Sequence, residues 1–407
     1  MSRPNRRRSE PREQFQALGE RVWLNTAHQG VLPDAAAEAA RAAVAWKQRP
    51  WELTQERFSG VPGALRSTLA RLLGAPEEEV VLANSSSYGL HLLANGFPWR
   101  SGDEVLLVRG DFPSTILPWL GLERRGVAVR FLEPRGPAVT AEEVAAHLGP
   151  RTRVLCTTWV HSFTGHAIDE RAVGEACRAR GVRFVLNASQ GVGARPLPVA
   201  DLPLDAVTGV GFKWLCGPYG TGFCWVRSEL LAQLEHNQLY WLAFQTAGDL
   251  EGGGPDGPPD EGPGAPRQSP AGAGPAVDPD RVRELGARRY DVFGTANFFN
   301  FSAWTAALEV VLDHGVEAIA AHDQALVERL IAGLDEGRFE LTSPREGPER
   351  STLVFLTHRD PAENRAVHRR LRDAGVHCAL RRGRLRLSPH LYNTPEDVDR
   401  ALEVLHR

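Results

Sequence analysis

The chain has 407 residues, 42% of them hydrophobic and 24% charged, which is enough apolar material for a sizeable core. Its formal net charge of -3 gives no general attraction to nucleic acid or anionic membranes and favours a small-molecule partner. No apolar run could span a bilayer, and no hydrophobic stretch follows the arginine-rich N-terminus, so we expect a cytoplasmic protein without a secretory signal.

Short apolar runs alternate with helical patterns through the first two thirds of the chain. The predicted strands are Val80–Leu82, Glu104–Val108, Val127–Leu132, Val154–Thr158, Arg183–Leu186, Ala206–Val210 and Gly222–Val226. The predicted helices between them include Ala64–Leu73, Ala141–Leu148 and Glu170–Arg180. This alternation predicts an α/β fold with a mostly parallel seven-stranded sheet and helices on both faces.

From about residue 304 the pattern changes to a long amphipathic helix, then short strands at Ser351–Leu356 and Arg384–Leu387 and a closing helix from Pro395. We interpret this part as a small C-terminal α+β domain. The expected organisation is a disordered basic tail over 1–20, a large domain over 21–310 and the small domain over 311–407. Within Gly252–Ala276, 15 of 25 residues are Gly or Pro, which predicts a disordered insertion over 248–280.

Lysine is almost absent from the chain. Of the 47 basic residues only Lys47 and Lys213 are lysines, although two lysines could also occur anywhere by chance. Unlike a guanidinium, an amine can lose its proton and attack a carbonyl carbon. Lys213 follows a predicted strand and precedes a glycine-rich turn, so we expect its side chain to lie in a cleft. It is the first candidate for a catalytic residue.

The segment around Lys213 carries a family motif. Its sequence, GFKWLCGPYGTGF, resembles the lysine signature of class V aminotransferases, which include cysteine desulfurases, isopenicillin N epimerases and, more distantly, kynureninases. The resemblance runs from Trp23 to the C-terminus apart from the Gly/Pro-rich insertion. It implies a fold type I enzyme with pyridoxal 5'-phosphate held by the large domain, an internal aldimine on Lys213, an amino acid substrate, and a homodimer with shared active sites.

Two further segments resemble cofactor-binding motifs of this family. Asn84–Gly89 follows a strand and opens a helix, where free amides favour a phosphate, and the resemblance implies Ser86 and Ser87 as its ligands. Read alone, this serine run could also be a simple helix N-cap. Phe112 stands where the family places the side chain that stacks on the pyridine ring. Ser162 stands where a polar residue contacts the cofactor hydroxyl.

The remaining implied contacts lie further apart in the chain. Asn187 and Gln190 stand at the strand end that normally supplies an aspartate to the pyridine nitrogen. Thr295 resembles the residue that reaches the phosphate of the neighbouring subunit. Arg386 matches the arginine that binds the substrate carboxylate, a task that suits a guanidinium. His28 is a candidate substrate contact, with a purely structural histidine as the alternative.

Three positions depart from the family pattern. Asn187 replaces the aspartate that keeps the pyridine nitrogen protonated, which makes the ring a weaker electron sink. Phe212 replaces a common histidine, and Val210 a phosphate-binding serine. We expect either an enzyme whose reaction tolerates a poor sink, such as racemisation, or one with a displaced acidic partner. The alternative is a degenerate relative with weak or no cofactor binding and a non-catalytic role.

The sequence leaves transamination, epimerisation and lyase chemistry open. Cys378 superficially resembles the mobile cysteine of desulfurases, but it lies eight positions before Arg386, too close for a long flexible loop, so sulfur transfer is disfavoured. The five cysteines lack the paired spacing of disulfides or zinc sites and are read as buried side chains. A nucleotide-binding module is disfavoured, because neither glycine-rich phosphate-binding motif of that class occurs.

Overall fold

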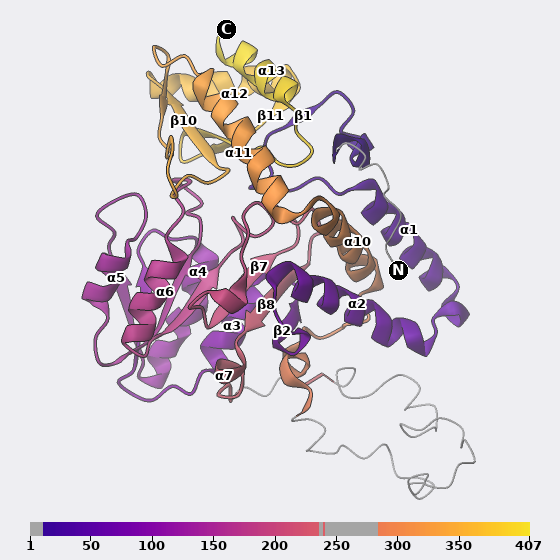
Figure 1. Ribbon diagram of the computed structural model, residues 1–407, viewed down its shortest axis with the longest axis vertical. Helices are drawn as coiled ribbons and strands as arrows, with labels where there is room; N and C mark the ends of the chain where they lie inside the picture. The colour runs from indigo at the N-terminus through magenta and orange to yellow at the C-terminus, as the bar shows by residue number, and fades with distance from the viewer. Residues whose placement is uncertain (1–10, 236–238, 241–283) are drawn as a thin grey trace, which may run out of the picture.

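The computed structural model describes residues 11–235, 239–240 and 284–407 of the chain (Figure 1). The insertion predicted over 248–280 and the first ten residues of the predicted tail lie outside the described residues. None of the described helices is both long and apolar enough to cross a membrane.

The larger part of the molecule is built on a seven-stranded sheet with the strand order β2-β8-β7-β6-β5-β3-β4. Its strands are β2 (Val80–Ala83), β3 (Glu104–Val108), β4 (Ala128–Leu132), β5 (Thr152–Thr158), β6 (Arg183–Asn187), β7 (Ala206–Val210) and β8 (Gly222–Val226). Within this sheet β8 runs antiparallel to both of its neighbours, and the other pairs are parallel. The predicted mostly parallel seven-stranded sheet is therefore confirmed, with strand ends within two residues.

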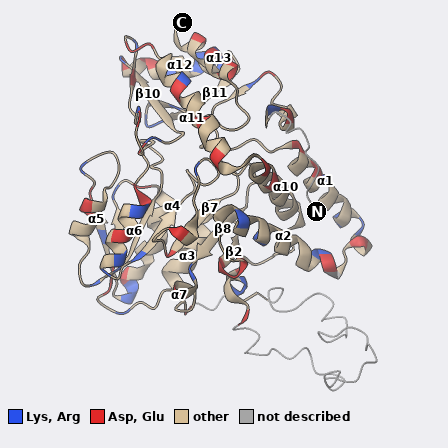
Figure 2. Ribbon diagram, in the orientation of Figure 1, with Lys and Arg blue, Asp and Glu red and all other residues tan. Residues whose placement is uncertain are grey.

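Helices cover both faces of this sheet because each strand buries side chains on both sides. Val105 and Leu107 of β3 pack toward one face, and Leu106 and Val108 toward the other. One face carries α2 (Gln55–Leu73), α5 (Ala141–His147), α6 (Glu170–Ala179) and α10 (Phe298–His314), with α1 (Asp34–Gln48) outside α10; the other carries α3 (Ser86–Gly96), α4 (Pro113–Leu120) and α7 (Ser228–Leu231). Strands β2, β7 and β8 carry no charged residue, whereas charges of both signs lie along the outer helices (Figure 2).

The helix predicted over Ala64–Leu73 starts nine residues earlier, at Gln55. Its first turns contain Pro62, which disfavours a helix locally. They pack against α10, where the rings of Phe58 and Phe298 meet edge to face at 5.1 Å. Tertiary packing thus outweighs local propensity at this end of the helix.

The C-terminal part is a four-stranded antiparallel sheet of order β12-β13-β10-β9 with helices on one face, which confirms the predicted small α+β domain (top of Figure 1). Its elements are α11 (Val316–Ala332), β9 (Phe339–Leu341), β10 (Val354–His358), α12 (Asn364–Asp373), β12 (Ala379–Arg381), β13 (Arg384–Leu387) and α13 (Pro395–Leu405). The predicted boundary between residues 310 and 311 stays a prediction.

The N-terminal segment joins the small domain before it reaches the large one. Strand β1 (Val22–Trp23) pairs in parallel with β11 (Val376–His377) of the C-terminal part. The structure differs from the predicted tail over residues 11–20, where Phe15 is buried and its ring centroid lies 5.1 Å from that of Tyr392. Arg12 donates a hydrogen bond to the Tyr392 carbonyl at 3.1 Å. Residues 11–20 therefore pack against the C-terminal part, because the Phe15 ring and the Arg12 guanidinium both contact Tyr392.

Candidate functional site

Lys213 lies in the loop that leaves β7 and returns to β8. Burial, and then the charges of Arg386 and Arg381, lower the pKa of Lys213 to about 7. Its Nζ atom lies 5.7 Å from the ring centroid of Phe112 and 5.9 Å from that of Phe212. Near neutral pH a substantial fraction of this amine is unprotonated, which is the form that can attack a carbonyl.

The backbone of Lys213 is held by segments that are distant in sequence. Gly30 lies so close that a Cβ atom there would be 2.0 Å from the Lys213 carbonyl oxygen. Gln190 is buried, donates to the Ala27 carbonyl at 3.0 Å and accepts from the Trp214 indole at 3.2 Å. The predicted site residue Gln190 therefore connects the N-terminal segment with the lysine loop.

A buried histidine fixes the peptide that follows Lys213. His390 Nε2 lies 2.8 Å from the Trp214 carbonyl oxygen, and His390 Nδ1 lies 2.8 Å from Asp323 Oδ2 on α11. Burial alone would lower the pKa of His390, but the charge and hydrogen bond of Asp323 outweigh it and raise the pKa to about 10. Because both ring nitrogens face oxygen acceptors, the ring donates two hydrogen bonds as an imidazolium. No local pattern around His390 indicated this role, since Asp323 is remote in the chain.

Phe112 precedes α4, and a buried carboxylate beside it sets its position. The Asp111 carboxylate accepts hydrogen bonds from the Phe112 amide (2.6 Å), the Thr157 hydroxyl (3.1 Å), and the amide and hydroxyl of Thr158 (2.9 and 2.8 Å). Burial raises the pKa of Asp111 against these hydrogen bonds, which favour the carboxylate. The Phe112 ring stacks on that of Phe163 at 6.1 Å. Sequence reasoning assigned no role to Asp111.

Asn187 ends β6 and its amide orientation is determined by its neighbours. Its Oδ1 atom accepts from the Ser189 amide (3.2 Å), the Ser189 hydroxyl (2.7 Å) and the Ser86 hydroxyl (3.1 Å). A backbone amide can only donate, so the atom facing it must be the oxygen. Asn187 Nδ2 donates one hydrogen bond to the Thr115 hydroxyl at 3.0 Å, which leaves its second N–H for a ligand.

The start of α3 offers amide groups to an anion. Ser85 is the N-cap and accepts from the Tyr88 amide at 3.2 Å. Ser86 is buried, and its hydroxyl lies 2.7 Å from that of Thr208, so this side chain joins the Asn187 cluster. Ser87 occupies the second helical position and is half-buried. The amides of the first turn have no partner within the helix, which suits a phosphate.

Arg386 extends from β13 and is buried, with 3% of its surface exposed. Its Nε and Nη2 atoms have no hydrogen-bond partner in the described part of the chain. Burial, and then the charge of Arg381, lower the pKa of Arg386 to about 9, so it stays cationic at neutral pH. A buried cation with free donors is costly unless an anion completes it, so Arg386 suits a carboxylate ligand.

The remaining predicted site residues are His28, Ser162 and Thr295. His28 Nδ1 lies 3.4 Å from Arg381 Nη2, and burial, then the charges of Arg381, Arg386 and Lys213, lower the pKa of His28. Ser162 is buried in the turn after β5. Thr295 is buried in the loop before α10, and no hydrogen bond or ion pair within the described residues joins it to the Lys213 group.

Cys378 lies between β11 and β12, away from any long loop. It is buried, and burial raises the pKa of its thiol to about 12. A thiol with so high a pKa is a weak nucleophile at neutral pH.

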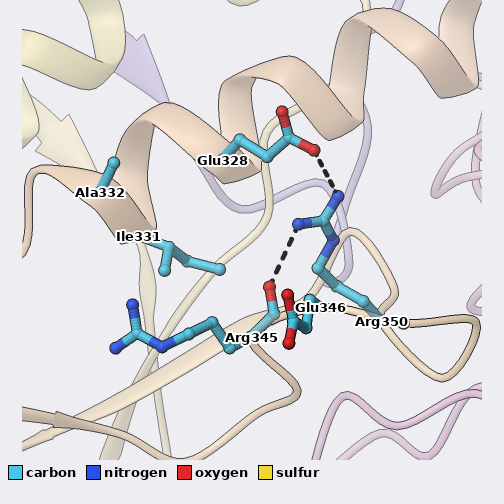
Figure 3. A pocket seen from close by; sticks show the side chains of 7 residues that line it. Glu328, Ile331, Ala332, Arg345, Glu346 and Arg350 are labelled. Atoms are coloured by element: carbon cyan, nitrogen blue, oxygen red, sulfur yellow. Dashed lines mark hydrogen bonds and ion pairs between the residues drawn. The ribbon is translucent and has the colours of Figure 1, made fainter.

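A hollow between α11 and the loop after β9 contains none of these residues (Figure 3). Arg350 on its wall pairs with Glu328 at 2.7 Å and donates to the Arg345 carbonyl at 3.1 Å. The guanidinium of Arg350 therefore has partners within the protein, unlike that of Arg386, and the hollow is not the candidate site.

Comparisons with known proteins agree on one family. Residues 48–240 match the family model of class-V aminotransferases, and residues 318–405 match that of the kynureninase C-terminal domain. Isopenicillin N epimerase of Streptomyces clavuligerus is 28% identical over 403 residues, which cover 94% of each chain. A probable cysteine desulfurase of Methanothermobacter thermautotrophicus is 28% identical over 171 residues, 42% of this chain and 43% of that protein. The solved structure of the cystine C-S lyase C-DES with cysteine persulfide has a TM-score of 0.81 at 22% identity and covers 96% of this chain and 99% of that one.

Proposed function

The chain belongs to the class V aminotransferase family with the fold type I architecture, and from this premise we propose that it acts at the amino group or Cα of an amino acid through Lys213. Its cofactor is pyridoxal 5'-phosphate. One observation carries the proposal: the Lys213 Nζ atom lies 5.7 Å from the ring centroid of Phe112, and burial and the charges of Arg386 and Arg381 lower its pKa to about 7.

The residues around Lys213 suit this cofactor. The first amides of α3, with Ser87, would hold the phosphate, and the face of Phe112 would cover the ring. Ser162 would contact the ring hydroxyl, and Gln190 keeps the lysine loop in place. When bound, pyridoxal phosphate supplies an aldehyde that condenses with primary amines and a conjugated ring that takes up electron density from Cα.

The protein's own groups then perform the proton chemistry. Arg386 binds and orients the substrate carboxylate, and the Lys213 amine removes a proton from Cα and returns it. Asn187 would offer an N–H to the ring nitrogen, and a nitrogen that accepted this hydrogen bond would stay unprotonated. Such a ring stabilises negative charge at Cα less well, so we favour a reaction that tolerates a weak electron sink, such as epimerisation.

The position of Cys378 supports a reaction without sulfur transfer. Its thiol is buried, its pKa is raised to about 12, and it lies between two paired strands. Persulfide transfer needs a reactive thiolate that reaches the substrate. Although relatives of the chain include probable cysteine desulfurases, we propose that Cys378 has a packing role.

We further propose a cytoplasmic homodimer in which Thr295 reaches the phosphate of the second subunit. Phe293 and Phe299 flank Thr295 in sequence and are 60% and 43% exposed, and a second subunit would cover this apolar surface. Light scattering during size-exclusion chromatography tests the dimer. A purely monomeric protein would contradict it.

The test of the proposed function uses the two lysines of the chain. Purified protein mixed with pyridoxal phosphate should become yellow, and borohydride should fix the cofactor to the peptide that contains Lys213. The Lys213→Ala variant should remain colourless, while Lys47→Ala, which changes an exposed lysine on α1, should behave like the unaltered protein. A colourless unaltered protein that ignores the cofactor would favour the degenerate, non-catalytic alternative.

Asn187→Asp tests the part of the proposal that concerns the ring nitrogen. A carboxylate should favour the protonated form of that nitrogen and raise the rate of Cα proton exchange by about tenfold, the effect of roughly 1.4 kcal/mol on the barrier. Exchange is measured in deuterated water by mass spectrometry. Unchanged absorbance and unchanged exchange would remove Asn187 from the argument.

A further inference from the structure

Three arginines share one face of the β12–β13 hairpin. Residues directly opposite in an antiparallel pair project to the same face, as do residues two apart along a strand. Ala379 pairs with Arg386, and Arg381 pairs with Arg384, so all three arginines project to one side. The intervening Leu385 projects to the other side and packs in the core of the small domain.

This face of the hairpin is turned toward Lys213. The Phe355 ring, on the residue of β10 that pairs with Arg386, packs against Gly165 in the turn after β5. Arg381 Nη2 lies 3.4 Å from His28 Nδ1, on the segment that crosses the lysine loop. The charges of Arg381 and Arg386 both lower the pKa of Lys213. Arg381 therefore lies on the same side of the site as Arg386, nearer the hairpin turn and half-buried.

The protein supplies no anion to this cluster. Among the residues that the structure describes, none of Arg381, Arg384 and Arg386 forms an ion pair. The α-carboxylate of a substrate would provide one negative charge, which Arg386 would take because its buried Nε and Nη2 atoms lack partners. The charge of Arg381 would remain uncompensated beside it, and like charges held close together repel.

We propose that the substrate is an acidic amino acid, whose α-carboxylate binds Arg386 and whose side-chain carboxylate binds Arg381. This inference rests on the proposed function and names its substrate class. A planar carboxylate matches the fork of donors that a guanidinium presents. The His28 ring accepts from Arg381 and so orients the guanidinium, which leaves the remaining donors of Arg381 for the ligand.

Glutamate and glutamine form the matched pair for the test, because they have the same shape and differ in side-chain charge. Each is titrated into the enzyme loaded with pyridoxal phosphate, and binding is followed by the cofactor absorbance. We expect glutamate to bind about tenfold more tightly, the effect of one charge-assisted hydrogen-bonded pair. Arg381→Gln should remove this difference by weakening glutamate binding alone. Equal affinities in the unaltered enzyme would overturn the proposal.

Arg369→Gln is the matched control. Arg369 is an exposed arginine on α12, on the helical side of the small sheet, so its removal changes the net charge equally without touching the site. It should preserve the preference for glutamate. A variant Arg369→Gln that lost the preference as Arg381→Gln does would show a nonspecific charge effect and would overturn the assignment to Arg381.

A second measurement separates this inference from the proposed function. Glutarate has no amine and cannot condense with the cofactor, so its binding to protein without cofactor can be measured by calorimetry beside that of butyrate. A preference for glutarate that depends on Arg381 supports the paired-carboxylate site whatever the reaction. If the protein binds pyridoxal phosphate but prefers neither glutamate nor glutarate, the proposed function survives and this inference fails. If Arg381→Gln weakens cofactor binding instead, Arg381 serves the cofactor and the inference also fails.

Discussion

Two sides of the site around Lys213 differ in how their polar groups are satisfied. On the large sheet, the Asp111 carboxylate accepts four hydrogen bonds from the backbone and side chains of the protein itself. On the small domain, Arg386 is buried with two donors free, and Arg381 beside it forms no ion pair in the described chain. Buried groups whose hydrogen bonds are all made within the protein position the site, whereas buried groups without a partner mark where a ligand completes it.

Replacing Arg386 tests the unsatisfied side and should give the largest effect. Arg386→Gln removes the cation that we propose binds the substrate carboxylate, so amino acids should bind about 100-fold more weakly to the loaded enzyme. The free energy of unfolding without cofactor should stay the same or rise, because an unpartnered buried charge is removed. Absorbance titration and urea unfolding measure the two quantities. A loss of stability would mean that Arg386 already has a partner in the protein, and would contradict the view that its donors are free for a ligand.

Replacing Asp111 tests the saturated side. One carboxylate oxygen faces the Phe112 amide and the other faces the Thr158 amide, so neither orientation of an asparagine amide fits. Asp111→Asn should lower the free energy of unfolding by about 2–3 kcal/mol, the cost of unsatisfied buried groups. Urea unfolding gives the value. The control Asp313→Asn, at an exposed position of α10, should stay within about 0.5 kcal/mol of the unaltered protein.

The pH dependence of cofactor binding tests whether burial and the charge of Arg386 lower the pKa of Lys213. The rate at which cofactor-free protein takes up pyridoxal phosphate should rise with pH, with a midpoint at the lowered pKa of about 7. Arg386→Gln should move this midpoint to higher pH, because one of the charges that lower the pKa is gone, while burial remains. A midpoint near the ordinary lysine value of 10.5 would mean that the amine faces water.

The same pKa also predicts how stability changes with pH. Between about pH 7 and 10.5 the unfolded Lys213 binds more protons than the folded one, so stability should rise with pH across this window relative to Lys213→Met. Below that window both states are protonated and the penalty is constant. Urea unfolding at several pH values, compared between the two proteins, measures the difference.

Replacing Cys378 should have the smallest effect. Cys378→Ser places a hydroxyl in an apolar site and should cost about 1 kcal/mol of stability, with substrate turnover within about twofold of the unaltered enzyme. Turnover assays and urea unfolding measure both. Persulfide formation from cysteine that disappears in this variant would show that sulfur transfer had been wrongly disfavoured.

Local patterns in the sequence were sufficient for the sheet and for the small domain, and they also singled out Lys213. Each apolar strand is visible as a short hydrophobic run. Lys213 is one of only two lysines in the chain and lies within a family motif. The resemblance also drew attention to Arg386, and the structure adds that its donors are free. The roles of Asp111 and His390 could not be predicted, because each depends on partners from elements distant in the chain.

The contact between His390 and the Trp214 carbonyl limits how the two domains can move. One nitrogen of the buried His390 ring contacts Asp323 on α11, and the other contacts the carbonyl of Trp214, the residue after Lys213. Any displacement of α11 must move the backbone next to Lys213 as well, or break one of the two buried contacts of His390, with Asp323 or with the Trp214 carbonyl. A shift of the small domain at α11 would therefore also shift the Lys213 backbone, so the position of this lysine is coupled to that of the small domain.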